Sequence, residues 1–175
     1  GPHGFTATGD GTIAEPWNPG APYLYYPAAS YPHKGHDVLM RAFAALQARG
    51  LDRHRLVFTG EKTSHWAKLQ RLARELRLDG KVIHLGFVSP HEVNRIYVGA
   101  EAVVFPTRFE GFGLPVLEAV ERKKKVIVSR LPIFDELGVP RRWQIDFAVP
   151  DELAAALAQA RPTEIQKQPR TRSDV

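Results

Sequence analysis

The sequence predicts an α/β fold with a doubly wound parallel sheet that is covered by helices on both faces. Short apolar runs alternate with longer segments of helical periodicity along most of the chain. Apolar strands in such an alternation are typical of parallel sheets joined by right-handed crossovers. The chain has 175 residues, 43% of them hydrophobic, which suffices for one domain with a core and is too short for two ordinary domains.

The first elements follow a lead-in. Residues 1–22 are rich in Gly, Pro and Thr without an apolar period, so they predict a linker, whose first four residues resemble a processed expression-tag end. Residues 23–26 form a short apolar run between two prolines and predict a buried strand. Residues 37–49 have the apolar period of a helix, and residues 55–59 predict the next strand.

The middle of the chain continues this alternation. Residues 64–78 predict a helix, because apolar side chains recur at helical spacing while charged ones take the opposite side. Residues 81–85 predict the third strand. Ser89 is followed by proline and, three positions after the serine, by Glu92, a capping box that begins a short helix reaching about Gly99.

The last third of the chain repeats the pattern. It predicts a strand at residues 102–105, a helix at 114–122, a strand at 126–128 and a helix at 151–160. Residues 161–175 are polar and predict a disordered tail. The predicted domain therefore spans residues 23–160.

Composition excludes several classes of site. The chain has no Cys, which rules out disulfides and thiolate nucleophiles and fits a reducing compartment. It has no run near the roughly 20 apolar residues of a membrane span and no secretion signal at its start, so we expect a cytoplasmic protein. The net charge of +5 predicts a solvated surface or one that attracts anions. Nucleic acid is not an expected partner, because the aromatic residues do not interleave with the basic ones.

The most informative stretch is the fourth strand with the loop and helix that follow it. Glu110 and Glu118 lie eight positions apart, and Gly111 and Gly113 stand between them. The glycines let the backbone approach a ligand. The free N–H groups of a helix N-terminus suit an anionic diphosphate, and carboxylates suit the hydroxyl groups of a sugar. The segment therefore predicts a sugar-nucleotide site.

This segment, Glu110-Gly-Phe-Gly-Leu-Pro-Val-Leu-Glu118, resembles the Glu-x7-Glu motif of the family 4 (group 1) glycosyltransferases. These are mostly retaining enzymes with the GT-B fold of two facing Rossmann-like domains. The resemblance covers about residues 23–160, and its second anchor is Lys34-Gly35, similar to the family's Lys-Gly step. It implies that the chain is the Rossmann-like, donor-binding half of a GT-B enzyme. We expect this half to be nearly inactive without its N-terminal, acceptor-binding domain.

The resemblance also implies roles for single residues. Glu110 would contact the donor sugar, and Glu118 would accept hydrogen bonds from the ribose hydroxyls. Lys34 would bind the diphosphate and stabilise charge on the leaving group, together with the loop amides near Gly113 and Leu114. The alternative for either carboxylate is an exposed surface charge.

Other donor contacts are expected around this motif. Gly111 and Phe112 complete the loop. Many relatives carry an arginine shortly before the matching lysine, whereas residues 27–30 read Pro-Ala-Ala-Ser here. Ser30 and Arg108 are the candidate substitutes, and Arg108 has the alternative of a surface arginine.

Further candidates follow other strands. Gly60 ends the second strand, and Phe87 and Val88 occupy the family's base-binding loop after the third, although Phe87 has the alternative of a core residue. Asp135 and Glu136 follow the fifth strand, where relatives have an acidic residue in the site. The alternative is that these carboxylates stabilise the N-terminus of a helix.

No metal is expected. His33 and His36 flank Lys34, but two histidines without a third ligand make a poor metal site. We expect both to be loop residues, and we expect no cofactor besides the donor substrate.

The function expected from the sequence is transfer of a hexose from a nucleoside-diphosphate sugar, with GDP-mannose as the first choice, to a glycan or lipid-linked acceptor. The acceptor would bind through the N-terminal domain, and the full protein is a candidate for peripheral association with the inner face of the membrane. Two alternatives stay open, half of a sugar-nucleotide epimerase and a nucleotide-binding module without chemistry.

Overall fold

The computed structural model describes residues 14–159, so residues 1–13 of the lead-in and the predicted tail 161–175 lie outside the described part. The strands are β1 (Tyr23–Pro27), β2 (Arg55–Thr59), β3 (Val82–His84), β4 (Ala102–Phe105), β5 (Val126–Ser129) and β6 (Gln144–Ile145). The α-helices are α1 (His36–Ala45), α2 (Trp66–Glu75), α3 (Pro90–Gly99), α4 (Leu114–Glu121), α5 (Pro132–Glu136) and α6 (Pro150–Leu157). Short 3-10 turns are η2 (Pro32–Lys34), η3 (Gln47–Arg49) and η4 (Arg141–Trp143).

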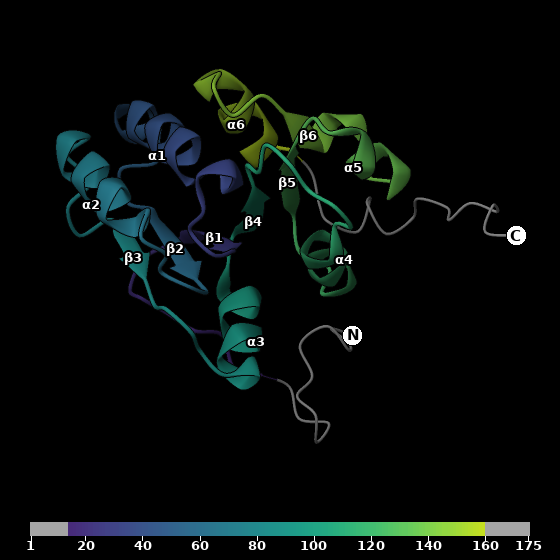
Figure 1. Ribbon diagram of the computed structural model, residues 1–175, viewed down its shortest axis with the longest axis horizontal. Coiled ribbons are helices and arrows are strands. Elements are labelled where there is room, and N and C mark those ends of the chain that lie inside the picture. Colours follow the sequence, from purple (N-terminus) through teal and green to yellow (C-terminus); the bar gives the residue numbers. More distant parts are fainter. Residues whose placement is uncertain (1–13, 160–175) are drawn as a thin grey trace, which may run out of the picture.

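All six strands form one parallel sheet in the order β3-β2-β1-β4-β5-β6. Helices α1, α2 and α6 cover one face, and α3 and α4 lie on the other (Figure 1). The predicted α/β fold is confirmed. The ten predicted strands and helices are present with bounds that shift by a few residues, whereas α5 and β6 were not predicted.

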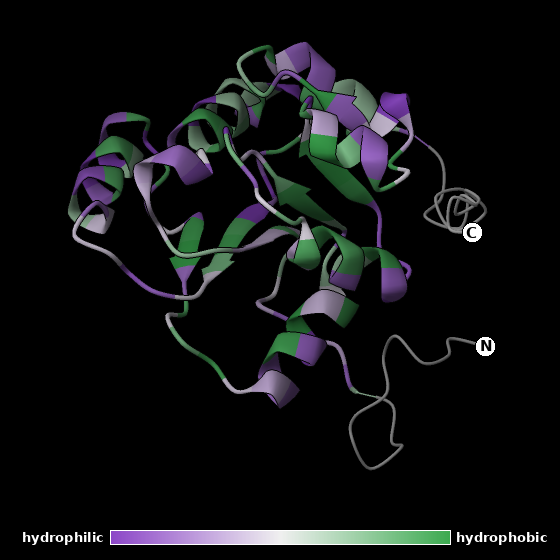
Figure 2. Cartoon of the chain, turned by 45° about the vertical axis from the view of Figure 1, so that its right-hand side comes forward, coloured by the Kyte–Doolittle hydropathy of each residue, from purple (hydrophilic) through white to green (hydrophobic). Residues whose placement is uncertain are grey.

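The core is centred on β1 and β4, which are buried on both faces. Figure 2 shows the hydrophobic residues gathered on the strands and on the inner sides of the helices. Buried tyrosine hydroxyls need partners, and β1 supplies three of them, of which that of Tyr25 lies 2.6 Å from the hydroxyl of Thr59. The hydroxyl of Tyr23 donates to the carbonyl of Ile96 at 2.7 Å, and that of Tyr26 donates to the carbonyl of Lys34 at 2.8 Å. Tyr26 thereby joins the core to the loop that begins α1.

The lead-in is not a free linker where it is described. The backbone N–H of Trp17 donates to the carbonyl of Arg95 at 3.0 Å. The Trp17 ring also meets the Tyr23 ring edge-on, with centroids 5.2 Å apart. Residues 14–22 therefore form no helix or strand, yet they pack against α3.

Helix α3 begins as predicted at Ser89, whose hydroxyl oxygen accepts from the N–H of Glu92 at 3.2 Å. The carboxylate of Glu92 pairs with Arg95 at 3.0 Å. Of the two hydrogen bonds of the predicted capping box, the structure therefore contains the one made by the serine hydroxyl.

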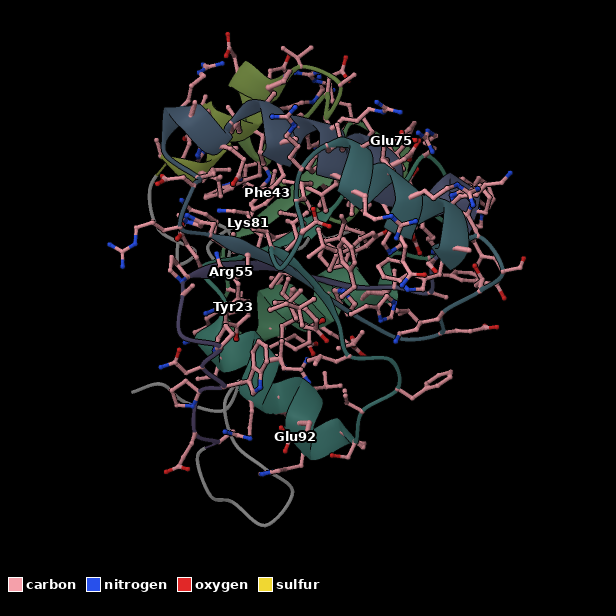
Figure 3. The ribbon with its side chains drawn as sticks, turned by 90° about the vertical axis from the view of Figure 1, so that its left-hand side faces the viewer. Tyr23, Phe43, Arg55, Glu75, Lys81 and Glu92 are labelled. Atoms are coloured by element: carbon pink, nitrogen blue, oxygen red, sulfur yellow. The ribbon has the colours of Figure 1, made fainter. Side chains whose placement is uncertain are left out.

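The strand order reverses between β1 and β4, because the chain moves from β1 toward β3 and then returns to continue from β4 to β6. In Figure 3, Tyr23 and Arg55 mark the first residues of β1 and β2, and Lys81 lies directly before β3. At the opposite, carboxyl ends, the connections after β1 and β4 diverge to opposite faces of the sheet. Such a reversal is where open α/β sheets bind ligands.

Candidate functional site

Two loops meet at the reversal, residues 28–35 after β1 and residues 106–113 after β4. The N–H of Arg108 donates to the carbonyl of His33 at 2.8 Å. The Arg108 guanidinium also donates to the carbonyl of Pro32 at 2.8 Å and to both carboxylate oxygens of Asp37 at 3.0 and 3.1 Å. The loops are therefore fixed to each other by backbone and side-chain bonds.

A glycine precedes each of the two helices that follow these loops, and only Gly35 lies between the loops themselves. Gly35 begins α1 with φ 77°, and a Cβ placed on it would lie 2.1 Å from the carbonyl oxygen of Pro106. Gly113 begins α4 with φ 70°, and its Cβ would lie 2.4 Å from a methyl carbon of Leu137. Both conformations favour glycine, so each helix has its first turn placed directly at the rim of the sheet.

Lys34 and Glu110, predicted separately, lie in direct contact. The Nζ of Lys34 is 3.4 Å from Oε1 of Glu110, with 23% and 15% of the two side chains exposed. Tyr26 lies beneath this pair, where burial and then the negative charge of Glu110 raise the pKa of its hydroxyl. The structure therefore brings the central cation and the central carboxylate of the predicted site together.

The other residues of the motif are accessible at the start of α4. Phe112 and Leu114 are exposed although they are large and apolar, and the first N–H groups of a helix have no intrahelical partner. Glu118 is exposed on α4, while the neighbouring Ala119 is buried in the core. The N-terminus of α4 and the Glu118 carboxylate are therefore both accessible from solvent.

The loops after β2 and β3 adjoin this rim. Gly60 has φ 104° and donates its N–H to the carbonyl of Gly86 at 2.9 Å, which holds the two loops together. Phe87 is 82% exposed and Val88 partly buried, so the alternative of Phe87 as a core residue is excluded.

Ser30 has a different environment from the one expected of a donor contact. Its side chain is buried, and its hydroxyl oxygen accepts from the N–H of Thr63 at 3.0 Å and lies 3.3 Å from the carbonyl of Glu61. In this geometry Ser30 ties the loop after β1 to the loop after β2.

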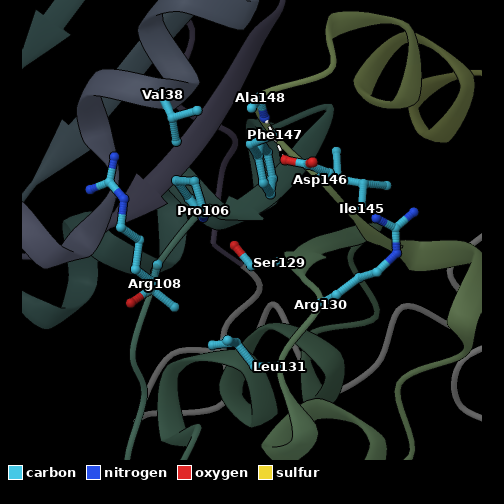
Figure 4. A pocket seen from close by; sticks show the side chains of 11 residues that line it. Val38, Pro106, Arg108, Ser129, Arg130, Leu131, Ile145, Asp146, Phe147 and Ala148 are labelled. Atoms are coloured by element: carbon cyan, nitrogen blue, oxygen red, sulfur yellow. Dashed lines mark hydrogen bonds between the residues drawn. The ribbon is translucent and has the colours of Figure 1, made fainter.

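Arg108 faces a neighbouring hollow of about 430 Å³ that is formed by the loops after β4, β5 and β6. Figure 4 shows Arg108 and Arg130 on opposite sides of it. Arg130 pairs with Glu152 at 2.6 Å, and Arg108 pairs with Asp37 at 3.0 Å. Each arginine thus has its own carboxylate partner.

Asp135 stabilises the edge of the sheet. Hydrogen bonds from Gln144 and then Arg141 lower the pKa of its carboxyl, with distances of 2.8 and 3.0 Å. These contacts join α5 to β6 and η4. Glu136 is exposed on α5.

The expectation that His36 is a loop residue is wrong. His36 begins α1 and is buried, with its ring 4.7 Å from that of Tyr26 and 4.9 Å from that of Phe58. Burial lowers its pKa to about 3. His33 is exposed in η2. Among the described residues, no group of three or more His, Asp or Glu side chains is placed to hold a metal ion.

Comparison with known families identifies the chain. The sequence model described as "Glycosyl transferases group 1" matches residues 13–170. The chain belongs to this family. In this group 1 glycosyltransferase domain, Lys34 and Glu110 are in contact at the carboxyl ends of the parallel strands.

Relatives within the family include the O-antigen chain mannosyltransferase RfbU of Salmonella typhimurium, with 34% identity over 115 residues, or 66% of this chain and 31% of that protein. The serotype-specific mannosyltransferase WbdA of Escherichia coli is 29% identical over 138 residues, or 78% of this chain and 17% of that protein. This group 1 glycosyltransferase chain thus spans less than a third of these relatives.

The fold is similar to the C-terminal domain of the group 1 family protein LpcC from Francisella tularensis. The TM-score is 0.67 at 22% identity, covering 85% of this chain and 81% of the other. The Rossmann-like character of this group 1 domain agrees with its parallel sheet. Within residues 14–159, no helix has the length and apolar character that crossing a bilayer demands.

Proposed function

We propose that this domain binds the nucleoside-diphosphate sugar of a retaining hexosyltransferase, with GDP-mannose as the donor. The contact between Lys34 and Glu110 at the reversal of strand order supports the proposal, because it brings a cation and a carboxylate together where open α/β sheets bind ligands. The mannosyltransferases among its relatives favour mannose.

In this proposal the diphosphate lies between Lys34 and the N-terminus of α4, where a positive charge and free N–H groups stabilise it. Glu118 accepts hydrogen bonds from the ribose, and Glu110 accepts them from the sugar. The loop that carries Phe87 lies beside the base.

Catalysis then depends on the leaving group. Negative charge grows on the diphosphate as the bond to the sugar breaks, so a positioned lysine stabilises the transition state more than the bound donor. The acceptor hydroxyl attacks from the face that the nucleotide leaves and gives its proton to the departing diphosphate, and configuration is retained. The N-terminal domain supplies the glycan or lipid-linked acceptor and excludes water.

We propose further that the full protein works in the cytoplasm and associates peripherally with an anionic membrane through α2. Residues 50–81 contain eight Lys and Arg against four Asp and Glu, so they carry +4 of the chain's net charge of +5. Lys68, Arg71 and Arg74 are exposed on α2, and none of the three forms an ion pair with a described residue. The outer side of α2 is visible in Figure 3.

The test is calorimetry of the chain with GDP, UDP, dTDP and their sugar derivatives, with and without a chelator. We expect GDP and GDP-mannose to bind without divalent metal, because lysine and backbone donors neutralise the diphosphate; binding of UDP or dTDP and their sugars instead would exclude GDP-mannose as the donor. Affinity that collapses with chelator would exclude the metal-free site, and failure to bind any nucleotide would exclude the function. In the two-domain enzyme, Lys34→Ala should depress turnover at saturating donor.

A further inference from the structure

The ion pair between Lys34 and Glu110 is built into the folded chain. The backbone of Lys34 is held from below by the Tyr26 hydroxyl at 2.8 Å. The neighbouring backbone of His33 is held by the N–H of Arg108 at 2.8 Å. Most of both charged side chains is buried, so solvent and salt screen the pair less than a surface pair. Any phosphate that recruits Lys34 must therefore compete with Glu110.

We infer that Glu110 makes the site selective for an intact sugar nucleotide over a free nucleoside diphosphate by controlling Lys34. This inference rests on the proposed function. A free nucleoside diphosphate draws Lys34 toward its phosphates but offers Glu110 no hydroxyl group. The carboxylate is then left without a partner beside another anion, which is unfavourable for a largely buried charge.

An intact sugar nucleotide completes the exchange of partners. Its sugar hydroxyls donate to Glu110 while its diphosphate takes the charge of Lys34, so each charged group gains a new partner for the one it loses. After the sugar has been transferred, the remaining nucleotide no longer satisfies Glu110. Lys34 then returns to the carboxylate, which favours release of the product.

The test is the variant Glu110→Gln, which keeps the side chain's size and removes its charge. Calorimetry compares the 175-residue chain and the variant with GDP, UDP and dTDP and with the matching sugar nucleotides. We expect the free nucleotide that the unmodified chain binds to bind the variant roughly three- to tenfold more tightly, the effect of a modest ion pair. The sugar nucleotide should gain nothing or lose affinity.

The matched control is Glu61→Gln. Glu61 is an exposed carboxylate in the loop after β2 and accepts from the Tyr31 hydroxyl at 3.1 Å instead of from a lysine. The same change of charge there should give a smaller gain. In a Lys34→Met background, the gain from Glu110→Gln should shrink to that of the control.

Each outcome separates the inference from the proposed function. If no nucleotide binds the unmodified chain, both are overturned. If nucleotides bind but Glu110→Gln gives no gain, a gain equal to the control, or the same gain without Lys34, only the inference is overturned. Unfolding of each variant in urea identifies a loss of binding that is due to a loss of folding.

Discussion

Gly35 lies so close to Pro106 that a Cβ on the glycine would be 2.1 Å from the proline's carbonyl oxygen. The first turn of α1 and the loop after β4 therefore touch through their backbones. A side chain at position 35 would push these two loops away from each other. One of the loops carries Lys34 and the other carries Glu110.

Gly35→Ala should consequently destabilise the domain by about 2–4 kcal/mol, since a backbone clash adds to a left-handed φ of 77°. Gly80→Ala is the matched control, because Gly80 has φ 75° and its Cβ would meet nothing within 4 Å. We expect the control to lose only about 1–2 kcal/mol. Urea unfolding measures both, and equal losses would contradict the close contact.

Glu118→Ala should weaken binding of the free nucleotide by roughly ten- to hundredfold, the effect of losing a charged hydrogen bond of about 1.5–3 kcal/mol. Glu121→Ala removes the same charge from an exposed position farther along α4 and should change affinity little. Calorimetry with the nucleotide measures both variants. A similar effect of the two substitutions would show that general charge, and not contact with ribose, is responsible.

The domain should lose stability below pH 6.5 because of His36. The pKa of this histidine is about 3 in the folded chain and 6.5 without the fold, so between these values the unfolded chain binds the extra proton. Stability is therefore complete above pH 6.5 and falls toward lower pH by up to about 1.4 kcal/mol per pH unit. In this pH range the buried imidazole of the folded chain stays neutral, whereas that of the unfolded chain is protonated.

His36→Phe should reduce the stability difference between pH 7 and pH 5 by about 2 kcal/mol. Burial also lowers the pKa of His84, to about 4, so part of the pH dependence should remain. Urea unfolding at the two pH values is the measurement, with His33→Phe as the same exchange at an exposed position. An unchanged difference in His36→Phe would contradict the buried neutral ring.

Binding to anionic vesicles should depend on α2. Replacing Lys68, Arg71 and Arg74 by Gln should weaken binding roughly a hundredfold, at about 1 kcal/mol per basic residue. The control removes three positive charges elsewhere, by exchanging Arg130, Arg141 and Arg142 for Gln. Co-sedimentation with vesicles of phosphatidylcholine and phosphatidylglycerol measures both. Equal weakening in the two variants, or binding to vesicles made only of phosphatidylcholine, would contradict membrane binding through α2.

The fold was predictable because five of its strands are apolar runs and its longer helices show a helical period. Each of the five predicted strands is an apolar run, and helices such as α2 alternate buried and exposed sides. β6 has two residues and α5 has five, which are too few to reveal any period. β6 is instead stabilised by contacts such as that between Gln144 and Asp135, which the sequence does not display.

The sequence predicted that Lys34 and Glu110 belong to one site, but it could not predict their contact. Loops after adjacent parallel strands share an edge, so Lys34 and Glu110 could be expected near the same rim. Their ion pair joins residues 76 positions apart, and its geometry depends on how closely Gly35 approaches Pro106. The contact between Ser30 and Thr63 also joins residues far apart in the sequence, so nothing near Ser30 indicated that its hydroxyl is buried there.

The central position of β1 sets the order in which this domain can be completed during synthesis. β1, β2 and β3 can pair as soon as they leave the ribosome, but β1 keeps one open edge until β4 arrives. The loops that carry Lys34 and Glu110 follow the two strands that meet in this pairing. A nascent chain that ends before residue 102 therefore has the loop that carries Lys34 but not the loop that carries Glu110, so the contact between these two residues can form only after β4 has been made.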